Sequence, residues 1–149
     1  MVRDGKSITA SAQQSEKFDV IIVGAGISGI GSATFLRKHC PHLSFAILEA
    51  LEGHGGTWLI HKYPGTRSDS DLFTFGYSFK PWTGQPIASR DQILDYLGDA
   101  IADAGLGPFI RYGHSVTSAD WSSETASWRL TVERKEAGDV VQLEANFLW

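Results

Sequence analysis

Hydrophobic residues in the first third of the chain follow the pattern of a strand, a turn, a helix and a second strand. Residues 18–23 (FDVIIV) form a nearly continuous apolar run rich in β-branched residues, which predicts a strand buried on both faces of a parallel sheet. Glycine-rich residues 24–29 follow, and residues 30–39 have the spacing of an amphipathic helix that Pro41 ends. Residues 43–48 (LSFAIL) predict the next strand. Together these elements predict a βαβ unit with parallel strands.

The middle of the chain lacks a regular hydrophobic period. Residues 50–80 are rich in glycine, aromatic residues and aspartate. We expect an ordered binding loop there, because a segment with this aromatic content is unlike a disordered one. Residues 89–104 predict a helix, since Ser89 and Gln92 have the spacing of a capping box and apolar residues then recur with helical spacing.

The last third of the chain alternates between apolar and polar residues with period two. This alternation predicts four strands, at residues 109–112, 115–121, 127–133 and 140–148. The predicted fold class is α/β: a Rossmann-like βαβ domain followed by a small antiparallel β-meander. The final residues are apolar, with no turn or polar tail after them. We therefore expect a truncated polypeptide whose fold is incomplete at the C-terminus and whose last strand is an unprotected edge.

Composition narrows the class of protein. The chain has 149 residues, enough for one domain with a core, and a formal net charge of −4, which gives no basic footprint for nucleic acid. Cys40 is the single cysteine, and the histidines show no ligand spacing, so no metal site is predicted. Residues 1–17 are polar and predict a flexible tail rather than a secretory signal. No segment has the length of a membrane span, and we expect a cytoplasmic protein.

Residues 24–29 (GAGISG) match a dinucleotide-binding fingerprint, GxGxxG, in the required context between a strand and a helix. Gly24 permits the tight turn, Gly26 lets the backbone approach a pyrophosphate, and Gly29 lets the helix pack on the strand. Ser28 can add a hydroxyl donor to phosphate. Glu49, twenty positions after Gly29, can accept the ribose hydroxyls, and its charge would repel a 2′-phosphate. This site should therefore hold FAD or NAD rather than NADP, the alternative being a glycine turn that binds nothing.

A second cluster of candidate residues lies in the middle loop. Gly55 and Gly56 again allow close approach of the backbone to a ligand, and Thr57 and Trp58 follow them directly. Further along, Arg67 and Asp69 form a polar pair in an otherwise aromatic segment. Either these residues belong to a binding site, or they form a solvated turn with a surface ion pair.

Several motifs in order along the chain resemble one enzyme family. The runs GGTW, YPGTRSDSD, FGYSFKPWTG and SADWSSE resemble the class B flavin monooxygenases, and more narrowly the type I Baeyer–Villiger monooxygenases of the mycobacterial ethionamide-activating kind. The resemblance covers residues 18–149, the N-terminal part of such enzymes, and implies a partial FAD-binding domain there. The FAD-contacting positions that it implies are Ser28, Glu49, Thr57, Trp58, Leu59, Ile60, Asp69 and, through the strand backbone at the adenine, Val116.

The resemblance also implies an activity for the parent enzyme. NADPH would reduce the flavin, O₂ would add to give a C4a-peroxyflavin, and that species would insert oxygen into a ketone or oxygenate a sulfide. Arg67, Ser68 and Asp69 match a loop that faces NADP, and Asp69 would help to orient a catalytic arginine.

The chain departs from the family pattern in what it lacks. A second GxGxxG, the FxGxxxHxxxW motif and the catalytic arginine are all absent, and His54 replaces the usual apolar residue before the double glycine. We therefore expect no NADP domain and no turnover from these residues alone. The alternatives are a non-enzymatic truncated FAD-binding fragment and a reductase from another family of flavoproteins with two dinucleotide sites.

Overall fold

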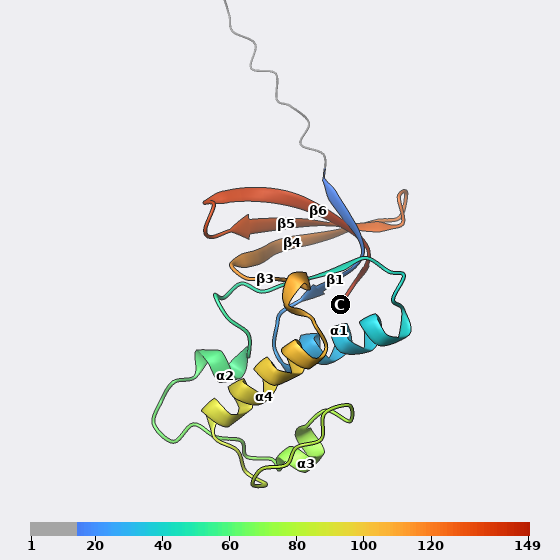
Figure 1. Cartoon of the computed structure of the whole chain (residues 1–149). Coiled ribbons are helices and arrows are strands. Elements are labelled where there is room, and N and C mark those ends of the chain that lie inside the picture. Colours follow the sequence, from blue (N-terminus) through green and yellow to red (C-terminus); the bar gives the residue numbers. More distant parts are fainter. Residues whose placement is uncertain (1–14) are drawn as a thin grey trace, which may run out of the picture.

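The computed structural model describes residues 15–149, which form one six-stranded sheet with helices on one face (Figure 1). The sheet order is β3-β2-β1-β6-β5-β4. In chain order the elements are β1 (Glu16–Val23), α1 (Ile27–His39), β2 (Phe45–Leu48), α2 (Thr57–Ile60), α3 (Leu72–Phe75), α4 (Arg90–Asp103), a 3₁₀ turn (Gly107–Phe109), β3 (Ile110–Arg111), β4 (His114–Ser122), β5 (Ser127–Arg134) and β6 (Asp139–Leu148).

The pairing of the strands confirms the predicted fold class. β1 pairs in parallel with β2, as expected for a βαβ unit, and β4, β5 and β6 form the antiparallel meander. One expected strand is placed differently. β3 is not part of the meander but pairs in parallel with β2 at the far edge of the sheet. The reason is the crossover through α4, which returns the chain in the same direction as β2.

The last strand lies inside the sheet, between β1 and β5. β6 runs parallel to β1, and beyond it the Trp149 N–H donates to the Ile21 carbonyl at 2.9 Å while the Trp149 carbonyl accepts from the Val23 N–H at 2.9 Å. The expectation of an unprotected edge at this strand is therefore wrong. The two edges of the sheet are β3 and β4.

The first strand begins earlier than the hydrophobic pattern predicts. Glu16 pairs with Leu143 and Lys17 with Glu144, so these two residues belong to β1 and not to a tail. Ser15 is described too, and its hydroxyl donates to a carboxylate oxygen of Glu144 at 3.0 Å. Residues 1–14 of the predicted tail lie outside the described residues. Polar residues extend the strand because β6 supplies a backbone partner along its whole length.

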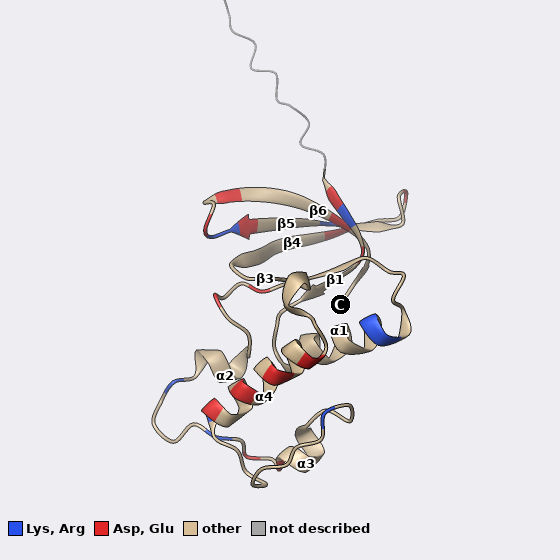
Figure 2. Ribbon diagram, viewed as in Figure 1, with Lys and Arg blue, Asp and Glu red and all other residues tan. Residues whose placement is uncertain are grey.

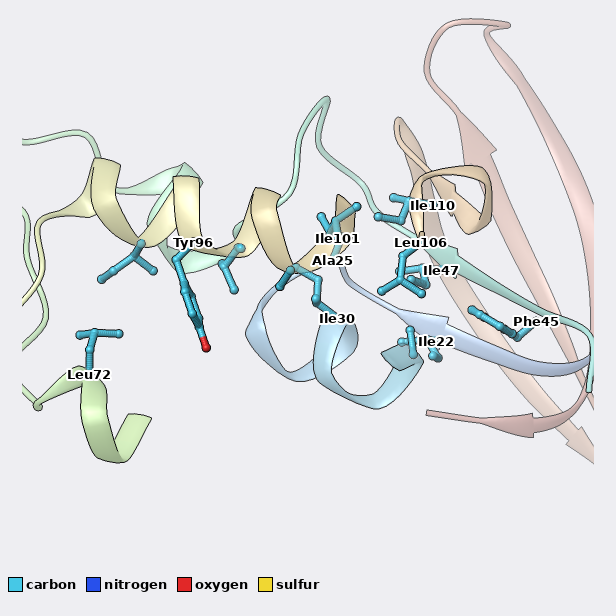
Figure 3. Close-up of a cluster of buried hydrophobic side chains, with 14 of the residues drawn as sticks. Ile22, Ala25, Ile30, Phe45, Ile47, Leu72, Tyr96, Ile101, Leu106 and Ile110 are labelled. Atoms are coloured by element: carbon cyan, nitrogen blue, oxygen red, sulfur yellow. The ribbon is translucent and has the colours of Figure 1, made fainter. Parts of the chain in front are cut away.

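The sheet separates two hydrophobic clusters, and β1 contributes to both. Ile22 faces α1 and α4 in the larger cluster, which Figure 3 shows together with side chains such as Ile30, Tyr96 and Ile101. Its neighbour Ile21 faces the other way, because successive side chains of a strand point to opposite faces. That second face is covered by the meander, whose buried side chains are Leu130, Val132, Leu143 and Ala145. β1 is thus buried on both faces at Ile21 and Ile22, as predicted, whereas Val23 at its end is 47% exposed.

The middle segment is held in place by short helices and by the start of α4. Two four-residue helices, α2 and α3, interrupt the predicted loop. The backbone N–H of Ser68 donates to Ala88 and that of Arg90 donates to Thr66, which ties the segment to the start of α4. The predicted capping box is confirmed, with both of its reciprocal hydrogen bonds formed at Ser89.

Figure 2 shows acidic residues along α4, four positions apart, at Asp91, Asp95, Asp99 and Asp103.

Candidate functional site

The glycine fingerprint forms the turn between β1 and α1. Gly24 has φ +99°, a conformation that L-residues other than glycine rarely adopt. A Cβ on Gly29 would lie 2.0 Å from the Gly24 carbonyl oxygen, so the fold itself requires glycine at that position. Gly26 is different, because a Cβ there would meet nothing closer than the Gly56 Cα at 3.8 Å. The fold leaves room at Gly26, and that room opens toward the second glycine loop.

The N-terminus of α1 has the features of an anion-binding site. Its N-cap is Gly26, which provides no side-chain cap, and the first turn contains no acidic residue. The first hydrogen bond of the helix runs from the Ile30 N–H to the Gly26 carbonyl at 3.0 Å. The three preceding N–H groups therefore have no partner within the helix, and the positive end of the helix dipole adds to them. A phosphate group is the ligand that such a terminus favours.

The double glycine lies directly opposite the fingerprint. The Gly55 N–H donates to the Ala25 carbonyl at 2.9 Å, which fixes the two loops together. Both glycines have positive φ, +120° at Gly55 and +53° at Gly56. A Cβ on Gly56 would lie 3.4 Å from the Gly26 Cα, so two glycine backbones face each other with no side chain between them.

A cavity of about 470 Å³ lies between the two loops. None of its lining residues is charged, so an anionic ligand there would rest on backbone N–H groups and on the helix dipole. The structure brings seven of the predicted site residues together in this cavity: Gly24, Gly26, Ser28, Gly29, Gly56, Thr57 and Trp58.

Glu49 stands at the carboxyl end of β2, as predicted, but its side chain is largely buried, with 6% of the residue exposed. One carboxylate oxygen accepts from the Ala25 N–H at 2.7 Å, and the other accepts from the Leu51 N–H at 2.9 Å. Each oxygen keeps a second lone pair for another donor. The pKa of nearby Tyr112 is raised, first by burial of its phenol and then by the negative charge of Glu49.

The other predicted residues lie outside the cavity lining. Ser68 is buried, and its hydroxyl accepts from the Ala88 N–H at 3.1 Å. Arg67 and Asp69, on either side of it, are exposed, and no ion pair joins them in the described part of the chain. The remaining three are Leu59 and Ile60 in α2 and Val116 in β4.

Three residues that were not among the predicted site residues also line the cavity: Val23, Ile27 and Phe75. Ile27 begins α1, and Phe75 comes from α3, where its ring meets Trp58 edge to face at 6.4 Å between centroids. Tyr77, two residues on, donates from its hydroxyl to the Ile27 carbonyl at 2.5 Å. Since α3 and its neighbours lack a hydrophobic period, only tertiary packing brings these aromatic residues to α1. Phe75 and Tyr77 also border an apolar hollow of about 700 Å³ alongside α1.

Two kinds of site are not found among residues 15–149. No group of three histidine, cysteine, aspartate or glutamate side chains is placed to hold a metal ion. Within the same range, no helix has both the length and the apolar character needed to cross a membrane.

Comparison with known proteins gives the class of this domain. The family model described as an NAD(P)-binding Rossmann-like domain matches residues 22–86, which include both glycine loops. With the sheet order and the β1–α1 turn, this match defines a Rossmann-like dinucleotide-binding domain.

Curated relatives make the class more specific. The chain is 48% identical over 135 residues to the FAD-containing monooxygenase EthA of Mycolicibacterium smegmatis, which covers 90% of this chain and 27% of that protein. It is also 48% identical over 119 residues to a probable FAD-binding monooxygenase, AlmA, of an Acinetobacter species, covering 79% of this chain and 24% of that protein. The chain thus spans about a quarter of the length of these relatives.

Solved structures agree with these relatives. An oxidized steroid monooxygenase bound to NADP matches with a TM-score of 0.78 and 33% identity, over 89% of this chain and 25% of that one. A cyclohexanone monooxygenase in its closed form matches with a TM-score of 0.76 and 27% identity, over 90% and 25%. The chain is a partial homologue of the FAD-containing monooxygenases, which confirms the resemblance found in its motifs.

Proposed function

We propose that this chain is the FAD-binding portion of an NADPH-dependent flavin monooxygenase and that residues 18–149 form its partial FAD domain. The observation that carries the proposal is the uncharged cavity between two facing glycine loops at the N-terminus of α1. Relatives with 48% identity are FAD-containing monooxygenases, which favours FAD over other dinucleotides.

The residues of the cavity fit a pyrophosphate group. Nothing in the protein itself excludes a side chain at Gly26. The space that a Cβ would fill there is therefore available to a phosphate group that approaches the backbone. The N–H groups at the start of α1 and the Ser28 hydroxyl would hold the phosphates, and Glu49 would accept the ribose hydroxyls. Thr57, Trp58 and the rest of α2 would lie toward the flavin. Bound FAD would supply the redox and oxygen chemistry, while the protein excludes water and orients the cofactor.

The proposed reaction belongs to the whole enzyme. Relatives more than three times as long as this chain would provide the NADPH site and a catalytic arginine. We place Arg67, Ser68 and Asp69 beside the nicotinamide, where the exposed carboxylate of Asp69 would anchor the guanidinium by charge-assisted hydrogen bonds. The substrates would be O₂ and a ketone or a sulfide. These 149 residues contain one glycine fingerprint, so by themselves they should oxidise NADPH no faster than free FAD does.

The test is the uptake of FAD by the purified chain. After incubation with FAD and gel filtration, flavin absorbance should elute with the protein. Glu49→Gln should retain less flavin because it removes the charge beside the ribose, whereas Glu124→Gln, at the exposed β4–β5 turn, should retain as much as the unchanged chain. A colourless, folded protein would contradict the proposal. NADPH oxidation well above that of free FAD would contradict the proposal that the NADPH site lies in the remainder of the enzyme.

A further inference from the structure

We propose that Lys135, in the turn between β5 and β6, is a further cofactor residue whose side chain forms a wall of the pocket for the adenine base. This inference rests on the proposed function, because it extends the same FAD site beyond Glu49. The motifs of the chain do not indicate Lys135. It is singled out by the hydrogen bonds and the pocket at the carboxyl edge of β2.

A continuous series of hydrogen bonds leads from the fingerprint to Lys135. Glu49 accepts from the N–H groups of Ala25 and Leu51. The Leu51 carbonyl accepts from the Gly113 N–H at 3.0 Å, and the Gly113 carbonyl accepts from the Lys135 N–H at 2.9 Å. The segment after β2, the β3–β4 connection and the β5–β6 turn therefore lie together near the carboxyl end of β2 (Figure 1).

A second pocket, of about 410 Å³, lies among these three segments. Ala50, Gly113, Ser115 and Lys135 are among its lining residues. Ala50 directly follows Glu49 in the chain, and Ala25, whose N–H donates to Glu49, lies between Gly24 and Gly26 of the glycine cavity. Glu49 therefore connects residues that border both pockets. A dinucleotide whose pyrophosphate occupies the glycine cavity would direct its base past Glu49 into this pocket.

Lys135 is held along one side of this pocket. Its ammonium lies 2.9 Å from a carboxylate oxygen of Glu52. Gly113, with φ +64°, lies beside both side chains, since a Cβ there would be in ordinary contact, 3.6 Å from both the Glu52 oxygen and the Lys135 Cβ. The two side chains are 68% and 67% exposed, so the pair adds little to folding stability. In this structure the ion-paired lysine has its stem along the pocket wall.

The stem of the lysine is suited to a flat aromatic base. Lysine buries its methylene groups along apolar surface while its ammonium stays in water. Covering one edge of a purine in this way removes a few tens of Å² of apolar surface from solvent, which corresponds to about a three- to tenfold gain in affinity. Methionine would preserve most of this surface, and alanine would remove it.

The experiment compares FAD and ADP binding by titration calorimetry to the unchanged chain, Lys135→Ala, Lys135→Met and the control Lys38→Ala, an exposed lysine near the end of α1. Lys135→Ala should weaken both ligands by the same factor, about three- to tenfold, with an unchanged free energy of unfolding without ligand. Lys135→Met and Lys38→Ala should bind within about twofold of the unchanged chain.

Three results would overturn the inference while leaving the proposed function intact. They are unaltered FAD affinity in Lys135→Ala, a loss for FAD without a loss for ADP, and a loss in Lys135→Met as large as that in Lys135→Ala. Failure of the unchanged chain to bind FAD would instead refute the proposed function, and the inference with it.

Discussion

Replacing Gly29 with alanine tests whether the packing of α1 on β1 depends on this one glycine. The new methyl group would lie 2.0 Å from the Gly24 carbonyl oxygen, whereas real Cβ contacts are essentially never closer than 3.0 Å. The helix or the turn must therefore move by at least about 1 Å. The atom in the way is a backbone oxygen and cannot rotate aside.

The energetic cost follows from this geometry. Forcing an extra methyl group into a well-packed site costs about 1–3 kcal/mol, and a clash with backbone belongs at the upper end of that range. Alanine recovers up to about 1 kcal/mol through its higher helix propensity. We expect Gly29→Ala to lower the free energy of unfolding by about 2 kcal/mol.

Urea denaturation followed by tryptophan fluorescence would measure this difference. The matched control is Gly107→Ala, because a Cβ on Gly107 meets nothing within 4 Å and its φ is ordinary. The control should unfold at nearly the same urea concentration as the unchanged chain. Equal midpoints for Gly29→Ala and Gly107→Ala would refute the claim that the fingerprint turn requires glycine at position 29.

Two further predictions concern stability. Tyr96→Phe should lower the free energy of unfolding by about 0.5–1.5 kcal/mol, because the Tyr96 hydroxyl accepts from the Tyr77 N–H at 2.7 Å and that partly buried donor loses its partner. Urea unfolding against the exposed control Tyr63→Phe measures this difference. The hydrogen bonds from Arg111 hold the pKa of Glu16 below its ordinary value of 4.5, so the pair stabilises the fold above pH 4.5 and this contribution is lost as the pH falls through the lower folded-state pKa. Glu16→Gln should therefore cost about 0.5 kcal/mol near neutral pH and nothing in strong acid, and a difference that persists there would contradict this explanation.

The sequence predicted the elements that have a clear hydrophobic period. The fingerprint, the strand before it and the capped helix at Ser89 each depend on local spacing, and each is found where it was expected, except that the strand begins two residues earlier. The placement of β3 and β6 could not be predicted in this way. Whether a short apolar run pairs with a neighbour or crosses to a distant strand depends on contacts far apart in the sequence, and these two strands pair with β2 and β1.

The same holds for the site: residues in local motifs were predicted, but contacts between distant segments were not. Gly26 and Gly56 were predicted separately from their motifs, but only the folded chain shows that their backbones face each other across one cavity. Phe75 was missed because α3 has a single turn and no periodic signal. Glu49 was placed correctly, yet its hydrogen bonds to Ala25 and Leu51 depend on a loop conformation that residue types do not specify.

The central claim is that the two glycine loops hold the pyrophosphate of FAD, and the most direct test is FAD titration of Gly26→Ala. The added methyl group meets only the Gly56 Cα at 3.8 Å, so the variant should fold, with a loss of at most about 1 kcal/mol for alanine at an N-cap. It should bind FAD at least about tenfold more weakly, because the methyl group occupies the space needed for phosphate approach. A folded Gly26→Ala chain with unchanged FAD affinity would contradict the claim.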